Sequence, residues 1–339
     1  MKRKQRPNSC APHAGVWLGL AVCVLASLVL GLALGRGSLD NPLLKDTLLS
    51  MRAQRVAVAF LGGAALATGG VIAQALFRNP LADPSVLGTT AGASLGGQLV
   101  LIATTLLLRG QLPAQVAPEM LVPMGCVAGA GLSLGVVLAV SSRRTSPITL
   151  VLTGFVLSSL FISFSTLLIS ASQESWQLMR ALNAFMNGSV SGSGPRQVTI
   201  AALLVVGGTL PALLWSRSLD LLLSGEEEAL SLGVDVPRVR TWAVIWAAVI
   251  TAGAVAVGAS VGFVGLVVPH AMRGLVGNVH RRLMPAAFFA GGAFLVLCDV
   301  LTRVIPFNGE ISLGAITGLI GAPVFLMMLK RLEQERSHV

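Results

Sequence analysis

Long uncharged stretches of apolar residues, separated by short polar segments, run through most of the sequence. A helix that crosses a bilayer needs about 20 mostly apolar residues, because about 30 Å of hydrocarbon is spanned at about 1.5 Å per residue. Eight stretches approach or exceed this length, at 16–35, 56–77, 86–108, 120–140, 148–170, 197–215, 283–301 and 311–329. Basic residues precede the first, but its length and the spans that follow favour a retained helix over a signal peptide.

A further stretch, 241–272, is uncharged throughout its 32 residues. As one straight helix it would be about 48 Å long, which a bilayer accepts only with strong tilt. Gly258, Gly262 and Gly265 lie inside it, so we expect the chain to turn there and form a seventh helix and a short, partly buried eighth. The pattern therefore predicts an all-α polytopic membrane protein with ten transmembrane helices.

Composition excludes the soluble classes. Hydrophobic residues make up 54% of the 339 residues and charged residues only 11%, and the mean hydropathy is +0.81. A soluble domain averages about 25% charged residues, so this chain cannot cover a water-facing surface as a soluble enzyme or a nucleic-acid-binding domain does.

The positive charges predict the orientation. With ten spans and the N-terminus inside, 16 of the 24 Lys and Arg residues fall on the inner side and eight on the outer side. An excess of Lys and Arg marks cytoplasmic loops, so we expect both termini inside. The predicted organisation is a cytoplasmic tail at 1–15, one transmembrane domain at 16–330 with a cytoplasmic loop at 216–240, and a cytoplasmic tail at 331–339.

Glycines four residues apart recur in the predicted spans. Such spacing lets helix backbones approach closely where lipid supplies no hydrophobic driving force, which predicts a compact bundle. The residues are Gly88, Gly92 and Gly96, and the pairs Gly125 and Gly129, Gly131 and Gly135, Gly258 and Gly262, and Gly314 and Gly318.

The sequence lacks the common motifs for nucleotide binding and for metal binding. Neither G-x-x-x-x-G-K-[ST] nor H-E-x-x-H occurs, and the four cysteines lack metal or disulfide spacing. A metal site at His270 and His280 is conceivable, but no carboxylate or thiol lies near them in sequence. Inside the spans only Asp299 is ionisable, and Arg303 one turn later favours a structural ion pair over a proton relay.

Two segments on the predicted inner side are unusual. Prolines bracket a tight connection at 78–88, where Asp83 or Ser85 can cap the following helix. The segment 224–237 predicts a short helix with acidic residues in its first turn and Gly233 at its end. This helix is either a solvated surface element or one that engages a cytoplasmic partner.

Two further features lie at the ends of predicted spans. At 262–273 we expect glycines and Pro269 to break the helix where it reaches the inner face. Arg52 and Arg55 lie one turn apart before the second span, and Arg303 closes the ninth. These arginines are either snorkelling anchors or docking residues for an acidic partner outside.

These segments resemble the FecCD-type permeases, the membrane subunits of type II ABC importers for iron-siderophores, haem and vitamin B12. The similarity covers residues 50–330, in order. It is carried by TGGVIAQALFRNPLADPSVLGTTA at 68–91, VGFVGLVVPHAMR at 261–273, NVHRRLMP at 278–285, CDVLTR at 298–303 and EISLGAITGLIGAPVF at 310–325. The chain departs from the family in lacking tryptophan at 185–192 and in reading Ile-Ser-Leu-Gly at 311–314.

The resemblance implies a non-enzymatic pore subunit in a bacterial cytoplasmic (inner) membrane. Two such subunits, as a homodimer or with a close relative, would form the pore above two copies of a separate ATPase that holds ATP and Mg²⁺, so this chain would bind no cofactor. A substrate-binding protein would dock outside on Arg52, Arg55 and Arg303. The coupling helix that fits the ATPase would include Gly225, Glu226, Glu227, Ala229, Leu232 and Gly233. The inner gate and its loops would include Asn79, Pro80, Asp83, Ser146, Pro147, Pro269, His270 and Arg273.

The expected function is passage of an iron complex, a ferric siderophore or haem, with cobalamin as the alternative substrate. An ion-coupled secondary transporter is the alternative class, but it would need a cluster of intramembrane ionisable residues where only Asp299 is present. A structural membrane scaffold is the third possibility, which co-purification of an ATPase would exclude.

Overall fold

A computed structural model describes residues 14–35, 42–107, 118–140, 147–172, 175–188, 194–258, 261–306 and 311–337. Every regular element in these ranges is helical. The elements are α1 (Ala14–Ala33), α2 (Pro42–Leu76), the 3₁₀-helix η1 (Pro84–Leu87), α3 (Thr89–Ile102), the π-helix η2 (Ala103–Leu107), α4 (Pro118–Val140), α5 (Pro147–Ala171), α6 (Trp176–Met186), α7 (Pro195–Leu214), α8 (Ser216–Ser224), α9 (Glu226–Ser231), α10 (Val236–Ala256), α11 (Val264–Val276), α12 (His280–Val304) and α13 (Leu313–Ser337).

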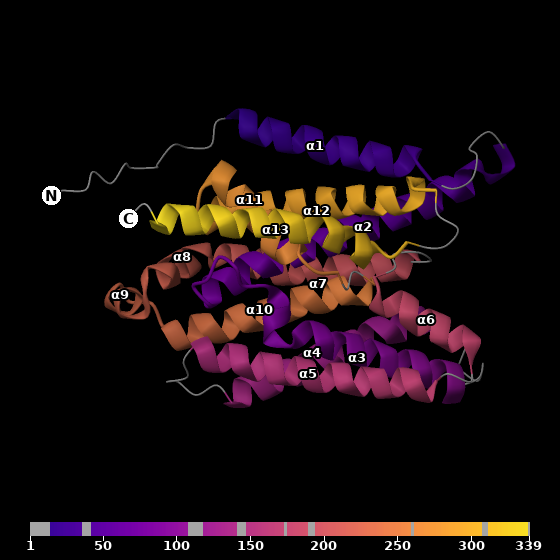
Figure 1. Cartoon of the computed structure of the whole chain (residues 1–339), viewed down its shortest axis with the longest axis horizontal. Coiled ribbons are helices and arrows are strands. Elements are labelled where there is room, and N and C mark those ends of the chain that lie inside the picture. The colour runs from indigo at the N-terminus through magenta and orange to yellow at the C-terminus, as the bar shows by residue number, and fades with distance from the viewer. Residues whose placement is uncertain are drawn as a thin grey trace.

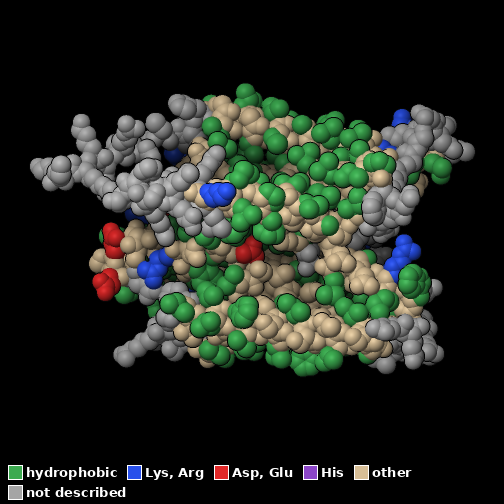
Figure 2. Space-filling view, viewed as in Figure 1, with side chains coloured by type: hydrophobic (Ala, Val, Ile, Leu, Met, Phe, Trp, Pro, Cys, Tyr) green, Lys and Arg blue, Asp and Glu red, His purple; other side chains and the backbone are tan. Residues whose placement is uncertain are grey.

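The long helices lie side by side along the long axis of the molecule (Figure 1). The start of α1 and the end of α13 lie at the same end as α9, which we call the α9 end. Apolar side chains cover much of the surface between the two ends of the molecule (Figure 2). Most of the visible charged side chains gather at the two ends. This distribution is that of a polytopic membrane protein, whose apolar middle faces hydrocarbon.

Seven of the described helices are long and apolar enough to cross a membrane, namely α1, α2, α4, α5, α7, α10 and α12. Val264–Val276 and Leu313–Met328 are shorter apolar helices, and α3 has 14 residues before it continues into η2. The all-helical polytopic architecture is therefore confirmed in the described chain, while the count of ten spans stays a prediction.

The predicted turn between the seventh and eighth helices is present. Helix α10 ends at Ala256, Gly258 has a φ of +75°, and Phe263 has a φ of +68° just before α11 begins. The prediction that Pro269 breaks the helix is wrong, because α11 continues through it to Val276. Proline lacks the N–H that would bond the carbonyl four residues earlier. The Gly265 carbonyl instead accepts a hydrogen bond from Gln74 Nε2 of α2 at 3.3 Å.

Glycines bring several helices into backbone contact. The prediction of close crossings is confirmed where α3 crosses α4. A Cβ at Gly92 or Gly96 of α3 would meet the carbonyl of Gly129 or Gly125 on α4. A Cβ at Gly63 of α2 would likewise meet the Gly291 carbonyl of α12. By contrast, a Cβ would meet nothing within 4 Å at Gly131, Gly135, Gly262 or Gly318. The first pairs thus set close helix crossings, and the latter four have no such role within the described chain.

Two short amphipathic helices were not predicted. Helix α6 buries Leu178 and Leu182 and exposes Trp176, and the Ser175 hydroxyl accepts from the Leu178 N–H at its start. Helix α8 buries Leu219 and Leu222 against the bundle. Neither segment contains a long apolar run, because only one face of each helix is buried.

Candidate functional site

Two of the three predicted docking arginines, Arg55 and Arg303, bind one buried carboxylate at the end of the molecule opposite α9. Asp299 of α12 is only 1% exposed. Its Oδ1 accepts from Arg55 Nη2 at 2.8 Å, and its Oδ2 lies 3.1 Å from Arg303 Nη2. The structure thus confirms the predicted ion pair between Asp299 and Arg303 and adds Arg55 as a second partner. We call Arg52, Arg55, Asp299 and Arg303 the arginine cluster.

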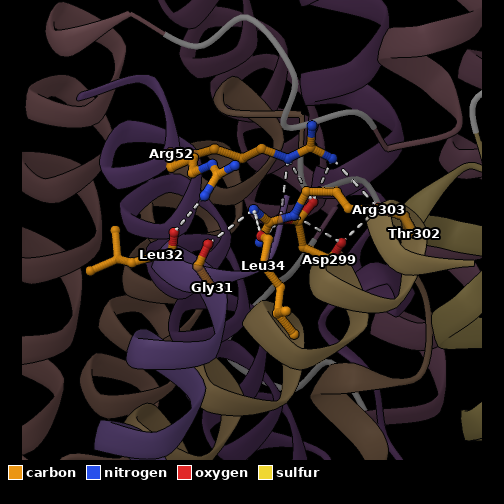
Figure 3. Close-up of polar contacts among 8 residues, drawn as sticks. Gly31, Leu32, Leu34, Arg52, Asp299, Thr302 and Arg303 are labelled. Atoms are coloured by element: carbon orange, nitrogen blue, oxygen red, sulfur yellow. Dashed lines mark hydrogen bonds and ion pairs between the residues drawn. The ribbon is translucent and has the colours of Figure 1, made fainter. Parts of the chain in front are cut away.

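Arg303 and Arg52 bind the last turn of α1 (Figure 3). Arg303 Nη1 donates to the carbonyls of Gly31 at 3.0 Å and Leu34 at 2.9 Å. Arg52 Nη1 donates to the carbonyls of Leu32 at 3.1 Å and Ala33 at 3.0 Å. The last carbonyls of a helix lack intrahelical partners and form the negative end of its dipole, so guanidinium groups stabilise them. The cluster therefore fastens α1 to α2 and α12.

The three arginines differ in exposure. Arg52 is buried and the Arg303 side chain is 5% exposed, whereas 27% of the Arg55 side chain is exposed. The cluster holds three guanidinium groups and one carboxylate, which leaves an excess of positive charge. Among the predicted docking residues, Arg55 is thus the one that offers most surface to a partner.

The predicted coupling residues lie on and around α9, which projects at one end of the bundle (Figure 1). Gly225, with a φ of +131°, precedes the helix and Gly233, with a φ of +80°, follows it. Ala229 is fully buried and holds the helix against the bundle, while Glu227 and Leu232 are exposed. The side chain of Glu226 lies outside the described residues. The predicted short helix is confirmed, although α8 adds a second helix to the 216–240 loop.

The first part of the predicted inner gate is a compact connection between α2 and α3. Asn79 and Pro80 are exposed, and the Asn79 side chain accepts from the Leu81 N–H at 2.9 Å. The Asp83 carboxylate accepts from the Ser85 N–H at 2.9 Å, so it caps η1. It does not cap α3, which begins only at Thr89 after Gly88. Burial raises the pKa of the Asp83 carboxyl above its ordinary value.

The second part of the predicted gate lies on α11, where Pro269 is buried and His270 and Arg273 are half-buried. A Cβ at Gly265 would lie 2.7 Å from Pro84 Cδ, so η1 and α11 are in direct contact. Pro147 is the first residue of α5, and Ser146 lies outside the described residues. The structure therefore brings together the gate segments from α11 and the α2–α3 connection.

One polar contact was missed from the sequence. Asp220 of α8 binds His280, the first residue of α12, through a distance of 2.6 Å between Asp220 Oδ1 and His280 Nδ1. Sixty residues separate the two positions, so no helical spacing could reveal the pair. The sequence indicates for His280 only a conceivable metal site together with His270.

The described chain is thus a polytopic helical bundle with close glycine crossings and a short helix that projects at one end. Residues 19–331 match the model of the FecCD transport family. The chain belongs to this family, and it is the multi-pass, non-catalytic permease of an ABC importer, which carries no cofactor. A permease of this class works with a separate ATPase and a binding protein.

Relatives with assigned names cover most of the chain. The Fe(3+) dicitrate transport system permease protein FecD of Escherichia coli is 36% identical and matches 94% of this chain and 97% of that one. The hemin transport system permease protein HmuU of Yersinia pestis is 32% identical with the same coverage. The cobalamin import system permease protein BtuC of Halobacterium salinarum is 36% identical and matches 84% of this chain and 73% of that one.

A solved structure has the same fold. It is described as an ABC transporter of the metal-chelate type in an inward-facing conformation. The TM-score is 0.82 at 27% sequence identity, and the match covers 94% of this chain and 99% of that chain.

Proposed function

We propose that this chain forms the translocation pathway for an iron complex, a ferric siderophore or haem, that a binding protein delivers from outside. The observation that carries the proposal is the similarity to FecD and HmuU over 97% of the length of each. Cobalamin is the second candidate, favoured by the 36% identity to a cobalamin import permease over 84% of this chain.

The substrate is tested with the cognate binding protein and the reconstituted importer. Titration of that binding protein with haem, a ferric siderophore and cobalamin should give tight binding for an iron complex. The loaded binding protein should then stimulate ATP hydrolysis by the permease and ATPase in proteoliposomes. Tight binding of cobalamin alone would replace the iron proposal by the second candidate, and an absence of stimulation by any loaded form would contradict both.

The proposed assembly has two permease subunits, most simply as a homodimer, and two ATPase subunits in a bacterial inner membrane. Each permease would have ten spans in a single domain at 16–330, with both termini and the 216–240 loop inside. The shared position of the α1 start, the α13 end and α9 supports this orientation (Figure 1). Large exposed apolar side chains on α5, among them Ile148, Phe155 and Leu167, support a face for a second subunit or lipid.

Helix α9 is proposed to fit a groove of the ATPase. Leu232 is 59% exposed, and with Leu230, which is 57% exposed, it forms the apolar part of a projection that also carries exposed glutamates. Burying a leucine side chain contributes about 1.5–3 kcal/mol. We expect Leu232→Asp to reduce co-purification of the ATPase about tenfold or more. The matched variant Leu232→Met keeps the apolar volume and should retain binding. Equal recovery of the ATPase with both variants would contradict this role for Leu232.

Arg55 is proposed to receive a carboxylate of the binding protein. We expect Arg55→Gln to raise the concentration of binding protein needed for half-maximal ATPase stimulation about tenfold, and to weaken its salt dependence. Arg196→Gln removes another exposed arginine, at the start of α7, and is the matched control. If both variants require the wild-type concentration of binding protein, Arg55 is not a docking residue.

A further inference from the structure

The first residue of α12 is hydrogen-bonded to α8, the helix that directly precedes α9 in the chain. We propose that Asp220 and His280 form a mechanical connection that transmits movement between the coupling helix α9 and the arginine cluster at the opposite end of α12. The inference rests on the proposed roles of α9 and the cluster, and it assigns positioning roles to two residues outside both.

The contact between Asp220 and His280 consists of two hydrogen bonds. Asp220 Oδ1 accepts the backbone N–H of His280 at 2.9 Å and lies 2.6 Å from His280 Nδ1. A carboxylate can only accept, so Nδ1 carries the proton in this contact. His280 is 0% exposed, whereas 31% of the Asp220 side chain is exposed. The negative charge also lies at the N-terminus of α12, where the helix dipole favours it.

Helix α8 links this contact directly to α9. Only Gly225 separates α8 from α9, and the Ala229 N–H donates to the Gly225 carbonyl at 3.0 Å. Leu219, the neighbour of Asp220 in sequence, is buried against the bundle. A displacement of α9 therefore reaches Asp220 through less than two turns of helix, and Asp220 passes it to the first residue of α12.

Helix α12 carries the displacement across the molecule together with α2. The two helices touch through backbone at Gly63 and Gly291, and Phe60 packs on Gly292. Near the end of α12, Asp299 binds Arg55 of α2 at 2.8 Å. The two helices are thus in contact from Gly291 to Asp299 of α12. Movement at His280 therefore shifts the arginine cluster, and docking at the cluster biases α8.

The test uses the complete importer in proteoliposomes with its ATPase and loaded binding protein. We expect Asp220→Ala to lower the stimulation by the binding protein about tenfold, within the range of typical coupling between sites, while basal ATP hydrolysis continues. His280→Ala removes only the side-chain bond and should lower the stimulation in the same direction but by less. The double variant should be no worse than Asp220→Ala alone, because Asp220→Ala already removes both hydrogen bonds between the two residues. His280→Asn, whose amide N–H replaces Nδ1–H, should restore most of the stimulation.

Asp235→Ala is the matched control, because Asp235 is an exposed carboxylate that caps α10 through the Arg238 N–H at 3.1 Å. It should keep wild-type stimulation. If Asp220→Ala does not assemble, the comparison of His280→Ala with His280→Asn decides. Additive losses in the double variant, wild-type stimulation in Asp220→Ala, or equal stimulation in the two His280 variants would overturn the connection. A wild-type importer that the binding protein does not stimulate would overturn the proposed function itself.

Discussion

Replacing Asp299 with asparagine is expected to destabilise the permease by about 3–5 kcal/mol, the usual cost of removing one partner from a buried ion pair. The carboxylate is 1% exposed and is the acid that both Arg55 and Arg303 share. Asparagine keeps the shape of the side chain but leaves the Arg303 guanidinium buried without an opposing charge. Loss of this anchor should also release the contacts that Arg303 makes with the last turn of α1.

The measurement is the midpoint of thermal or denaturant unfolding of the purified permease in detergent, together with its yield from membranes. Asp46→Asn is the matched control, since Asp46 lies on α2 and is exposed. That variant should unfold like the wild type, because isolated surface charges contribute little. An Asp299→Asn protein as stable as Asp46→Asn would show that the cluster does not hold the helices together.

Gly63→Ala is expected to destabilise the bundle by about 3 kcal/mol, at the upper end of the usual cost of overpacking a core. The added Cβ would meet the Gly291 carbonyl and would lie 2.6 Å from Leu295 Cβ. Neither of these atoms is the mobile end of a side chain, so α2 and α12 must separate. The effect is measured as the change in unfolding midpoint and in the yield of monodisperse protein.

Gly207→Ala is the control, and its expected change in stability has the opposite sign. A Cβ at Gly207 of α7 meets nothing within 4 Å, and alanine is favoured over glycine inside a helix by about 0.5–1 kcal/mol. This variant should be as stable as the wild type or slightly more stable. If Gly63→Ala behaved in the same way, the crossing of α2 and α12 would be looser than the backbone contact indicates.

The sequence predicted the parts of the fold that depend on local periodicity. Apolar run length located α5 within one residue at each end, since the predicted 148–170 became Pro147–Ala171. Helical spacing alone identified the Asp299–Arg303 pair. The turn after α10 followed from a run too long for one helix. Each of these features needs only neighbouring residues.

Local periodicity does not predict features that depend on residues far apart in sequence. Arg55 and Asp299 are 244 residues apart in sequence, and only the packing of α2 on α12 brings them together. Helices α6 and α8 were missed because amphipathic segments of 9–11 residues have no span-like signal. The sequence does not reveal that α11 continues through Pro269, because the Gln74 amide that satisfies the freed Gly265 carbonyl comes from a distant part of the chain.

That freed carbonyl makes two distant positions mutually dependent. A residue other than proline at 269 would supply an N–H to Gly265 and complete the hydrogen bonds of α11, which would normally favour the helix. Because a carbonyl oxygen has two lone pairs, the new N–H would share this acceptor with Gln74, whose side chain is buried in α2 some 191 residues away in sequence. A substitution at 269 therefore changes the surroundings of an acceptor on which α2 also depends, so its effect is not confined to α11.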